Sequence, residues 1–404
     1  MRCIIVGNGV AGMNTARLLR EKNQEIEIEI ITRESVPYYS RINLIEFLAG
    51  SIPQEKLFVF SPKWYEDRNI KVYYGTDVVA IDPRDRKIKL SNDEFLSYDY
   101  LVIAAGSTPF KPPVPNSNLM GIFTLRTLND AIAIRDHAAA GAKNAFVLGG
   151  GLLGIESAYS LKKMGLDVTI LEPSERLLPK QLDSEGAAVL VSILQERGLK
   201  LILGTAVGGF CGEERVTGVQ LNDGKRLPAE LVLISAGVRP NLSCLAGSGI
   251  RTDRGILVDD QMRSNLPDIY AVGDVAQWNE NVWGIVPVAL NQAAVAAANI
   301  AGELKKYSGT IPSNTLKVMG VDLAVYGEAQ NQEADCTNVR FRDLEHQVYA
   351  KIVLRDHCVI GAIVIGNKKM QNMLNKMVEN RQRMDEEEAQ RFFDTQMGVT
   401  DPSW

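Results

Sequence analysis

The chain has 404 residues, of which 46% are apolar and 23% charged, as is typical of a globular protein with two or three domains. Its net charge of −5 argues against a nucleic-acid-binding protein. The uncharged stretch 281–302 contains Pro287, Asn291, Gln292 and Asn299. It therefore predicts a buried helix and no membrane span.

The thiols and imidazoles indicate a reducing environment and no metal centre. The chain has five cysteines without a C-x-x-C pair, and its three histidines form no ligand cluster. Met1 leads directly into an apolar strand, which leaves no room for a signal peptide. We therefore expect free thiols, a cytoplasmic location and no bound metal.

The first dozen residues carry the clearest signal. Residues 2–6 predict a strand, Gly7, Gly9 and Gly12 mark a tight turn, and residues 13–22 predict a helix. Glycines at this spacing allow a sharp turn, a close approach of the backbone to a pyrophosphate, and tight packing of helix on strand. An ordinary βα turn is the alternative, so the pattern predicts a dinucleotide site without proving it.

The next segment supplies two candidate ligands of that dinucleotide. Residues 25–31 alternate between charged and apolar, which predicts a strand with one solvated face. Glu34 follows this strand, where an acid usually binds a ribose hydroxyl, although it could be a solvated loop carboxylate. Arg41 lies in the loop after it and either contacts a phosphate or is simply solvated.

Residues 62–68 predict a short helix, and residues 78–90 a hairpin that turns at 82–85. The buried strand 101–106 ends in small residues, which leave space for a ligand or allow close packing. The proline-rich stretch 111–115 then predicts a linker between domains.

A second strand–turn–helix pattern follows a helix that Thr127 and Asp130 should cap. The strand 145–148 runs into a turn with Gly149, Gly151 and Gly154. Two fingerprints imply two dinucleotides, and a flavin with a nicotinamide is the economical pair, because one can pass a hydride to the other. Glu172 ends the next strand, which favours NADH over NADPH, although nearby Arg176 weakens that preference.

The remaining residues predict that the chain returns to the first domain and then forms a third domain of different character. Asp274 stands at the tip of a strand, where it either meets a ligand or caps a turn. The uncharged helix through Gln292 could place its N-terminus near a flavin. Strands at 349–354 and 359–365 precede a long helix from Lys368. The methionine stripe of this helix predicts core packing. Its basic side is either solvated or a docking surface for a partner protein.

These patterns together resemble a known family. GNGVAG at Gly7, VPYYSR from Val36, LVIAAGSTP at Leu101, VLGGGLLGIE at Val147, ISAGVRPN at Ile234 and IYAVGD at Ile269 are similar to motifs of the FAD-dependent pyridine nucleotide-disulfide oxidoreductase superfamily. The chain looks closest to the NADH:rubredoxin oxidoreductase branch. LKVMGVDL, from Leu316, is similar to the start of that family's C-terminal interface domain.

The resemblance implies an α/β fold with two Rossmann-like, glutathione-reductase-like dinucleotide-binding domains and an α+β C-terminal domain. It implies an FAD-binding domain at 1–112 and 243–312, an NAD-binding domain at 113–242 and a C-terminal domain at 313–404. The implied FAD residues are Gly7, Gly9, Val10, Ala11, Gly12, Glu34, Arg41, Val78, Ala105, Gly106, Gly273 and Asp274. The implied NAD residues are Gly149, Gly151, Leu152, Leu153, Gly154, Glu172 and Gly237, with Glu156 near the nicotinamide.

One departure from the family pattern bears on the electron path. No cysteine occurs between Cys3 and Cys211, so the redox-active thiols of disulfide reductases and of peroxide-reducing members are missing. Electrons should therefore leave directly from the flavin to a small acidic redox protein such as rubredoxin, and no catalytic acid or base is assigned. A peroxide-forming NADH oxidase and a slowly turning NADH sensor remain alternatives, and the sequence leaves monomer and homodimer open.

Overall fold

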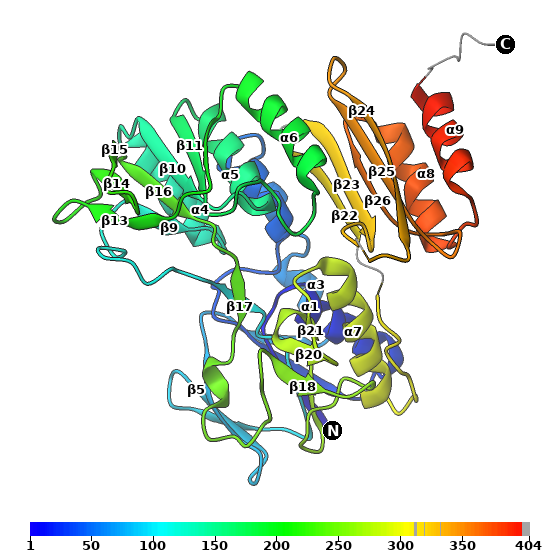
Figure 1. Cartoon of the computed structure of the whole chain (residues 1–404). Coiled ribbons are helices and arrows are strands. Elements are labelled where there is room, and N and C mark those ends of the chain that lie inside the picture. Colours follow the sequence, from blue (N-terminus) through cyan, green and yellow to red (C-terminus); the bar gives the residue numbers. More distant parts are fainter. Residues whose placement is uncertain (311–312, 319, 332, 398–404) are drawn as a thin grey trace. The chain divides into compact units, whose positions relative to one another are not determined.

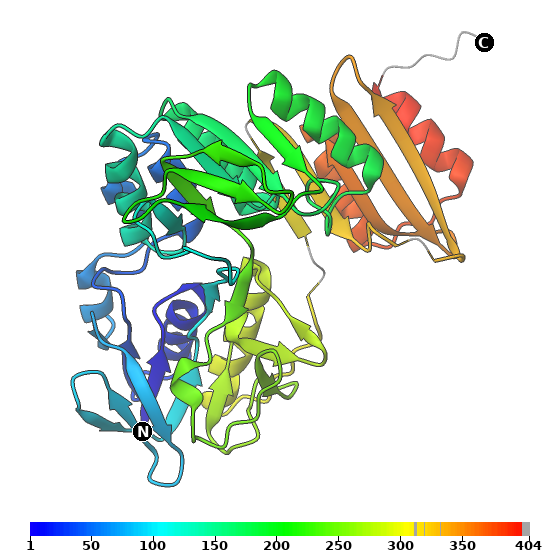
Figure 2. The same ribbon diagram turned by 60° about the vertical axis from the view of Figure 1, so that its left-hand side comes forward.

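The computed structural model describes the chain except for residues 311, 312, 319, 332 and 398–404. Its contacts divide the chain into two compact units. The first unit comprises Met1–Phe47, Ile52–Pro109 and Val238–Thr310, and the second comprises Leu48–Ser51, Phe110–Gly237 and Ile311–Trp404. The chain therefore passes between the units on either side of residues 48–51 and near residues 110, 238 and 310, and Figures 1 and 2 trace its course in colour.

The first unit is built on a parallel sheet with the strand order β19-β7-β1-β2-β3. These strands are β1 (Arg2–Val6), β2 (Glu27–Ile31), β3 (Ile70–Tyr73), β7 (Tyr100–Ile103) and β19 (Ile269–Ala271). Helices α1 (Val10–Lys22) and α7 (Val286–Ile300) pack on one face with Ile5, Ile28 and Val102. Ile4, Ile31 and Leu101 point to the other face, where they pack against the antiparallel sheet of β4 (Val78–Asp82), β5 (Lys87–Leu90) and β6 (Phe95–Ser97).

Smaller elements complete this unit. They are η1 (Arg41–Asn43), α2 (Leu44–Leu48), η2 (Gln54–Leu57), α3 (Pro62–Glu66), β4 (Val78–Asp82), β5 (Lys87–Leu90), β6 (Phe95–Ser97), β8 (Ser107–Pro109), β17 (Val238–Pro240), η3 (Ser243–Leu245), β18 (Ile256–Val258), η4 (Gly273–Val275), β20 (Ala276–Trp278) and β21 (Asn281–Val282). The predicted hairpin is confirmed as β4 and β5, to which β6 adds a third strand.

One expectation for this sheet is wrong. The alternation of β2 predicted one solvated face, but Glu29 is 8% exposed and its carboxylate accepts a hydrogen bond from Arg2 at 2.6 Å. Since strands of a parallel sheet are covered on both faces, a charged residue there must be paired. Helix α1 also begins at Val10, three residues before the predicted start, because Gly9 already has the extended conformation of an N-cap.

The second unit begins with another parallel sheet, in the order β12-β11-β10-β16-β9. Its strands are β9 (Ile122–Thr124), β10 (Asn144–Leu148), β11 (Asp167–Glu172), β12 (Lys200–Leu203) and β16 (Leu231–Ile234), and its helices are α4 (Leu128–Ala139), α5 (Leu152–Lys163) and α6 (Ser184–Glu196). An antiparallel sheet of β13 (Val207–Cys211), β14 (Gly218–Leu221) and β15 (Arg226–Pro228) adjoins it. The predicted capping box of Thr127 and Asp130 is confirmed at α4.

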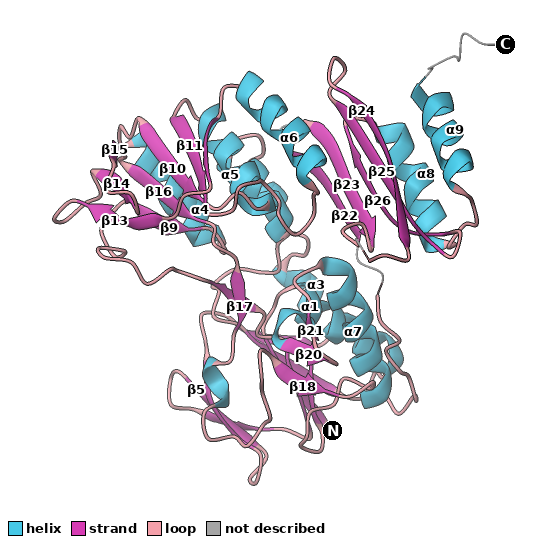
Figure 3. Ribbon diagram, in the orientation of Figure 1, coloured by secondary structure: helices cyan, strands magenta, loops and turns pink. Residues whose placement is uncertain are grey.

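The C-terminal part of this unit is an antiparallel sheet in the order β22-β23-β26-β25-β24. It comprises β22 (Ser313–Val318), β23 (Val321–Gly327), β24 (Cys336–Asp343), β25 (Val348–Arg355) and β26 (Cys358–Ile365), followed by α8 (Lys368–Glu379) and α9 (Glu386–Met397). Figure 3 shows α8 and α9 on one side of this sheet and α6 on the other. Met370, Leu374 and Met377 are buried in the core beneath α8, which confirms core packing for the methionine stripe.

The predicted domain boundaries at residues 112 and 242 stay predictions, and the boundary at 312 and the last seven residues lie outside the described part of the chain. The contacts place the predicted NAD-binding and C-terminal domains in one unit. Among the described residues, no helix has both the length and the apolar character needed to cross a membrane.

Candidate dinucleotide-binding sites

The first glycine turn has the geometry that its spacing predicts. Gly7 has φ +108°, and a Cβ on it would lie 2.3 Å from the carbonyl oxygen of Ala104. A Cβ on Gly12 would lie 1.9 Å from the carbonyl oxygen of Gly7. Both positions therefore require glycine for packing between strand, turn and helix, whatever the site binds.

Gly9 is different, and it tests whether a dinucleotide fits. Its backbone is extended, with φ −84° and ψ −171°, a conformation that any residue can adopt. A Cβ built on Gly9 meets no described atom within 4 Å. The side chain that is missing there would enter the open space in front of the N-terminus of α1, where unpaired N–H groups favour a phosphate. The site thus fits the pyrophosphate of FAD.

The parallel strands bring other predicted FAD residues to the same edge of the sheet. Gly106 follows β7, and Gly273 and Asp274 follow β19. Gly273 has φ +77°, its amide donates to Gln292 Oε1 at 2.8 Å, and Asp274 accepts a 2.7 Å hydrogen bond from the Ser107 hydroxyl. Val10 and Ala11 lie in the first turn of α1, Ala105 is half-buried beside Gly106, and Val78 is buried at the start of β4.

Glu34 lies after β2 and is already engaged. Its carboxylate accepts hydrogen bonds from the Tyr39 hydroxyl and, at 2.6 Å, from Arg41 Nη2. Each carboxylate oxygen has two acceptor sites, so a ribose hydroxyl can still bind beside these donors. We propose that Arg41 and Tyr39 hold Glu34 for the ribose. The guanidinium of Arg41 has further N–H donors, and its contact with a phosphate stays a prediction.

Asn8 and Tyr65 were missed by the sequence analysis. The Tyr65 hydroxyl donates to Asn8 Oδ1 at 3.1 Å, and both residues are buried. Asn8 Nδ2 is buried and has no hydrogen-bond partner among the described residues. A buried amide without an acceptor is costly, and an anionic group at the turn would satisfy it. An asparagine between two fingerprint glycines was the only signal in the sequence.

The second glycine turn, in the other unit, repeats the first. Gly149 has φ +120°, and its Cβ would lie 2.3 Å from the Ser235 carbonyl oxygen, while a Cβ on Gly154 would lie 2.0 Å from that of Gly149. Gly151 again is extended and has no described atom within 4 Å of an added Cβ. The turn therefore fits the pyrophosphate of a second dinucleotide at the N-terminus of α5.

Other predicted NAD residues surround this turn. Leu152 and Leu153 form the first turn of α5, and Leu153 is 38% exposed although it is apolar. Gly237, with φ +93°, follows β16 at the same sheet edge, and a Cβ on it would have no described atom within 4 Å. Glu172 ends β11 and accepts from the amides of Gly150 at 2.6 Å and Ser174 at 2.8 Å. Glu172 thus orients the turn, and it retains acceptor capacity for a ribose hydroxyl.

Glu156 lies one helical turn into α5, and burial raises its pKa from 4.5 to about 7. Between these two pH values the folded state keeps a proton that the unfolded state has lost. The stability contribution of this proton is therefore complete below pH 4.5 and is lost as the pH rises through about 7. We expect the unfolding temperature to fall about 5 °C more between pH 5 and pH 8 in the wild type than in Glu156→Gln. Identical pH profiles would show that Glu156 does not titrate in this range.

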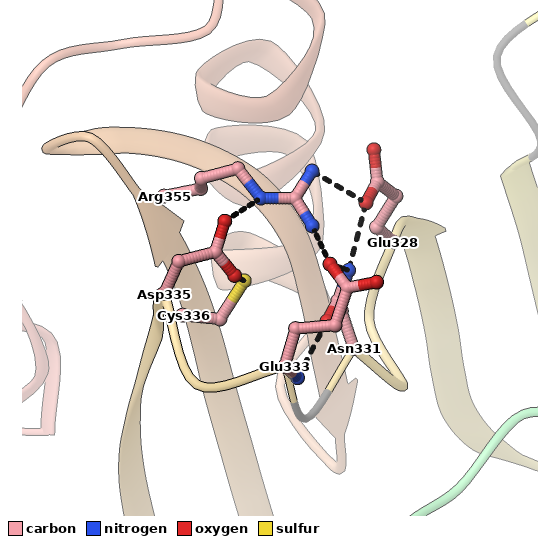
Figure 4. A network of polar contacts seen from close by, with 6 residues as sticks. All are labelled: Glu328, Asn331, Glu333, Asp335, Cys336 and Arg355. Atoms are coloured by element: carbon pink, nitrogen blue, oxygen red, sulfur yellow. Dashed lines mark hydrogen bonds and ion pairs between the residues drawn. The ribbon is translucent and has the colours of Figure 1, made fainter.

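A cluster of acidic residues lies in the C-terminal sheet, away from both turns in the sequence. Glu333, Asp335 and Cys336 have ligand atoms within 4.8 Å of one another. Figure 4 shows that the Arg355 guanidinium occupies the middle of this cluster, where it pairs with Glu333, with Asp335 at 3.1 Å and with Glu328 at 3.3 Å. The arginine supplies the positive charge that these carboxylates need, so the cluster does not require a metal ion for charge balance.

Comparisons with known proteins agree with this geometry. Residues 1–293 match the family model of the pyridine nucleotide-disulphide oxidoreductases. The chain belongs to this family. Residues 312–382 match the C-terminal domain model of rubredoxin NAD+ reductase. The family uses FAD and NAD(P)H, which agrees with the two turns, and its fold confirms the predicted α/β architecture.

Three relatives and one structure illustrate the range of this family. The chain is 33% identical over 378 residues to a nitrite reductase [NAD(P)H] of Bacillus subtilis, with 93% of this chain and 47% of the relative covered. It is 30% identical over 404 residues to an NADH oxidase of Methanocaldococcus jannaschii, with 93% of this chain and 90% of the relative covered. It is 32% identical over 384 residues to the NADH-rubredoxin oxidoreductase of Clostridium acetobutylicum, with 95% of this chain and 96% of the relative covered. It superposes on a covalent putidaredoxin reductase–putidaredoxin complex with a TM-score of 0.87 and 28% identity, covering 95% of this chain and 94% of that one. The chain spans about half the length of the first curated relatives that it matches.

Proposed function

We propose that this family member is an NADH-dependent FAD oxidoreductase that delivers electrons to a small acidic redox protein such as rubredoxin. A ferredoxin- or rubredoxin-reductase type of NAD(P)H oxidoreductase is what the relatives support. The observation that carries the proposal is the pair of turns in which Gly9 and Gly151 leave space in front of a helix N-terminus. When both dinucleotides are bound, a hydride passes from the nicotinamide to the flavin.

The chain's own residues bind and orient in this proposal. Amides at the N-termini of α1 and α5 hold the two pyrophosphates, while Glu34 and Glu172 accept from ribose hydroxyls. The Gln292 carbonyl holds the Gly273 amide, and Ser107 holds Asp274, so that the flavin side of the first unit is pre-arranged. Glu156 lies near the nicotinamide, and at neutral pH its carboxyl is partly protonated.

Glu172 supports NADH over NADPH. Its carboxylate is fixed by the amides of Gly150 and Ser174, so it cannot turn away from a 2′-phosphate. A carboxylate in that place repels the phosphate of NADPH but accepts a hydrogen bond from the 2′-hydroxyl of NADH.

The thiols support a direct path from flavin to acceptor. Each of the cysteines is a free thiol, and Cys3 and Cys244 are buried, with pKa values that burial raises to about 12 and about 11. Neither forms a thiolate at neutral pH, and the first unit contains no other cysteine. Free thiols also support the proposed cytoplasmic location.

An anaerobic titration tests the function. We expect one equivalent of NADH to bleach the flavin absorbance completely, and oxidised rubredoxin to restore it within seconds. NADPH should bleach it at least tenfold more slowly. No bleaching by either nucleotide would refute the proposal at the second turn.

Two other outcomes of this titration would favour the alternatives. The archaeal NADH oxidase among the relatives supports a peroxide-forming oxidase, for which the flavin would recover only when air is admitted. An NADH sensor would recover slowly with every acceptor and would change its assembly state when NADH is added.

The basic side of α8 is the proposed docking surface for the acidic acceptor. Lys368, Lys369 and Lys376 are exposed on this helix. Reversing Lys369 and Lys376 to glutamate should raise the KM for rubredoxin about tenfold at low salt and flatten its salt dependence. The rate of flavin bleaching by NADH should not change. Unaltered rubredoxin kinetics would show that the acceptor docks elsewhere.

A further inference from the structure

The loop between β11 and α6, residues 173–183, connects the NAD turn to the C-terminal sheet. Its last residue, Asp183, caps α6 by accepting from the Gly186 amide at 3.0 Å. The other carboxylate oxygen accepts from the Tyr349 hydroxyl at 2.6 Å and lies 3.4 Å from Lys351 Nζ. Both partners belong to β25, so one carboxylate joins the loop, the helix and the C-terminal sheet.

This junction is buried. The Lys351 side chain is fully buried and that of Asp183 is 7% exposed. Lys351 also donates to the Ala329 carbonyl at 3.0 Å, and the Tyr349 ring packs against Gly186. Although burial alone would raise the pKa of Asp183, the donors around it hold that pKa below its ordinary value. A buried ion pair adds little net stability but strongly favours one arrangement, because removing one partner leaves the other charge uncompensated.

The same loop holds the NAD turn at its other end. The Leu178 amide donates to the carbonyl of Gly150 at 3.0 Å, and the Leu178 carbonyl accepts from Gln181 and Leu182 at 2.8 Å each. Leu178 is fully buried with φ +49°, a conformation that is rare for a bulky residue. Such a backbone persists only where its surroundings hold it in place. Glu172, which accepts from the Gly150 amide and orients the fingerprint, also accepts from the amide of Ser174 in this loop at 2.8 Å.

Between these two ends the loop is not packed tightly on the C-terminal sheet. An open pocket of about 340 Å³ is lined by Lys180 and Gln181 of the loop and by the turn at 327–331 of the sheet. The sheet holds the loop through the contacts of Tyr349 and Lys351 with Asp183. The loop in turn contacts the NAD turn through the hydrogen bond from Leu178 to Gly150.

We propose that the hydrogen-bonded pairing of Asp183 with Tyr349 and Lys351 makes the C-terminal sheet a positioning element for the NAD site. In this arrangement Asp183 is a positioning residue that never contacts the nucleotide. The sheet fixes the loop, the loop fixes Gly150, and the turn is thereby kept open for the pyrophosphate. This inference rests on the proposed function, since it assumes that the second turn binds NAD(H).

The test measures binding of NAD+ to the FAD-loaded protein by titration calorimetry, which requires no electron acceptor. Asp183→Asn keeps a helix cap and a partner for Tyr349, but it leaves Lys351 as an unpaired buried charge. We expect this variant to bind NAD+ about tenfold more weakly, with the KM for NADH raised and kcat changed less than twofold. The double variant Asp183→Asn with Lys351→Met removes the carboxylate and the buried ammonium, while Arg340, which also lies 3.6 Å from Asp183, keeps its pair with Glu185 at 3.6 Å. Its NAD+ affinity should recover to within twofold of the wild type.

A matched control lies on the same interface. Gln347, in the turn before β25, donates to Glu196 at the opposite end of α6, so Gln347→Ala removes a contact between the C-terminal sheet region and α6 far from the loop. It should leave NAD+ affinity unchanged. FAD content and the unfolding temperature verify folding, and Tyr349→Phe carries the same test, with a smaller expected loss of about threefold, if Asp183→Asn does not fold. NAD+ affinity within twofold of the wild type in folded Asp183→Asn or Tyr349→Phe would overturn the inference alone, whereas a wild type that binds no NAD+ would refute the proposed function as well.

Discussion

Gly151→Val should abolish flavin reduction by NADH while the protein keeps its FAD. Gly9→Val should abolish FAD binding while the protein keeps its affinity for NAD+. Both glycines are extended, and an added Cβ meets no described atom, so the chain itself tolerates a side chain at either position. The bound pyrophosphate does not, because the side chain blocks its approach to the helix amides. Losing two or three charge-assisted hydrogen bonds corresponds to about 100-fold weaker binding.

Flavin absorbance of the purified protein measures FAD content, and calorimetric titration measures NAD+ affinity. Gly9→Val should purify largely without FAD and still bind NAD+, whereas Gly151→Val should purify yellow and bind NAD+ about 100-fold more weakly. Gly12→Ala and Gly154→Ala are the matched controls, since their Cβ atoms would lie about 2 Å from a backbone oxygen and should prevent correct folding. Full retention of both nucleotides in both valine variants would disprove the two assigned sites.

Replacing Arg20 by methionine should destabilise the first unit by about 4 kcal/mol. Arg20 is 6% exposed on α1, and its guanidinium donates to backbone carbonyls of Asn23, Gln24, Ile26, Arg68 and Asn69 at 2.7–3.2 Å. Methionine fills a similar volume but leaves these carbonyls without donors. Lysine cannot replace the planar fork either, because its ammonium reaches fewer of them.

Urea denaturation followed by flavin fluorescence would measure this loss in the unit that holds the flavin site. Arg17→Met on the same helix is the control, because Arg17 bonds only side chains of its own helix among the described residues: it pairs with Glu21 at 2.7 Å and donates to Asn14 Oδ1 at 3.3 Å. Such a pair is worth about 0.5 kcal/mol. If the two variants unfold at the same urea concentration, the buried guanidinium does not stabilise this unit as its geometry implies.

The elements that the sequence predicted well are those defined by local chemistry. The turns at Gly7 and Gly149 and the capping box at Thr127 depend on residues only a few positions apart, so their spacing was sufficient. The stripe at Met370 was equally local, because helical periodicity alone places it on one face.

The errors and omissions concern partners that are distant in sequence. Glu29 was expected on a solvated face because Arg2 lies 27 residues away, and Asn8 was overlooked because Tyr65 lies 57 residues away. The junction of Asp183 with Tyr349 spans 166 residues. No periodicity or motif encodes such pairs, which arise only when β25 is laid against α6.

Because the first unit is formed by segments on both sides of residues 110–237, it cannot be completed until the later segment has been synthesised. At a synthesis rate of about 5–20 residues per second, Asp274 emerges about 15–55 s after Gly7. Until then the edge of β7 that later pairs with β19 has no partner strand. By that time the whole segment 110–237 has been synthesised and can fold before the first unit is complete. FAD can therefore be captured only late in synthesis, and an exposed apolar strand edge awaits its partner in the meantime. Chains released before β19 is made should consequently contain a folded segment 110–237 and a first unit that is prone to aggregation.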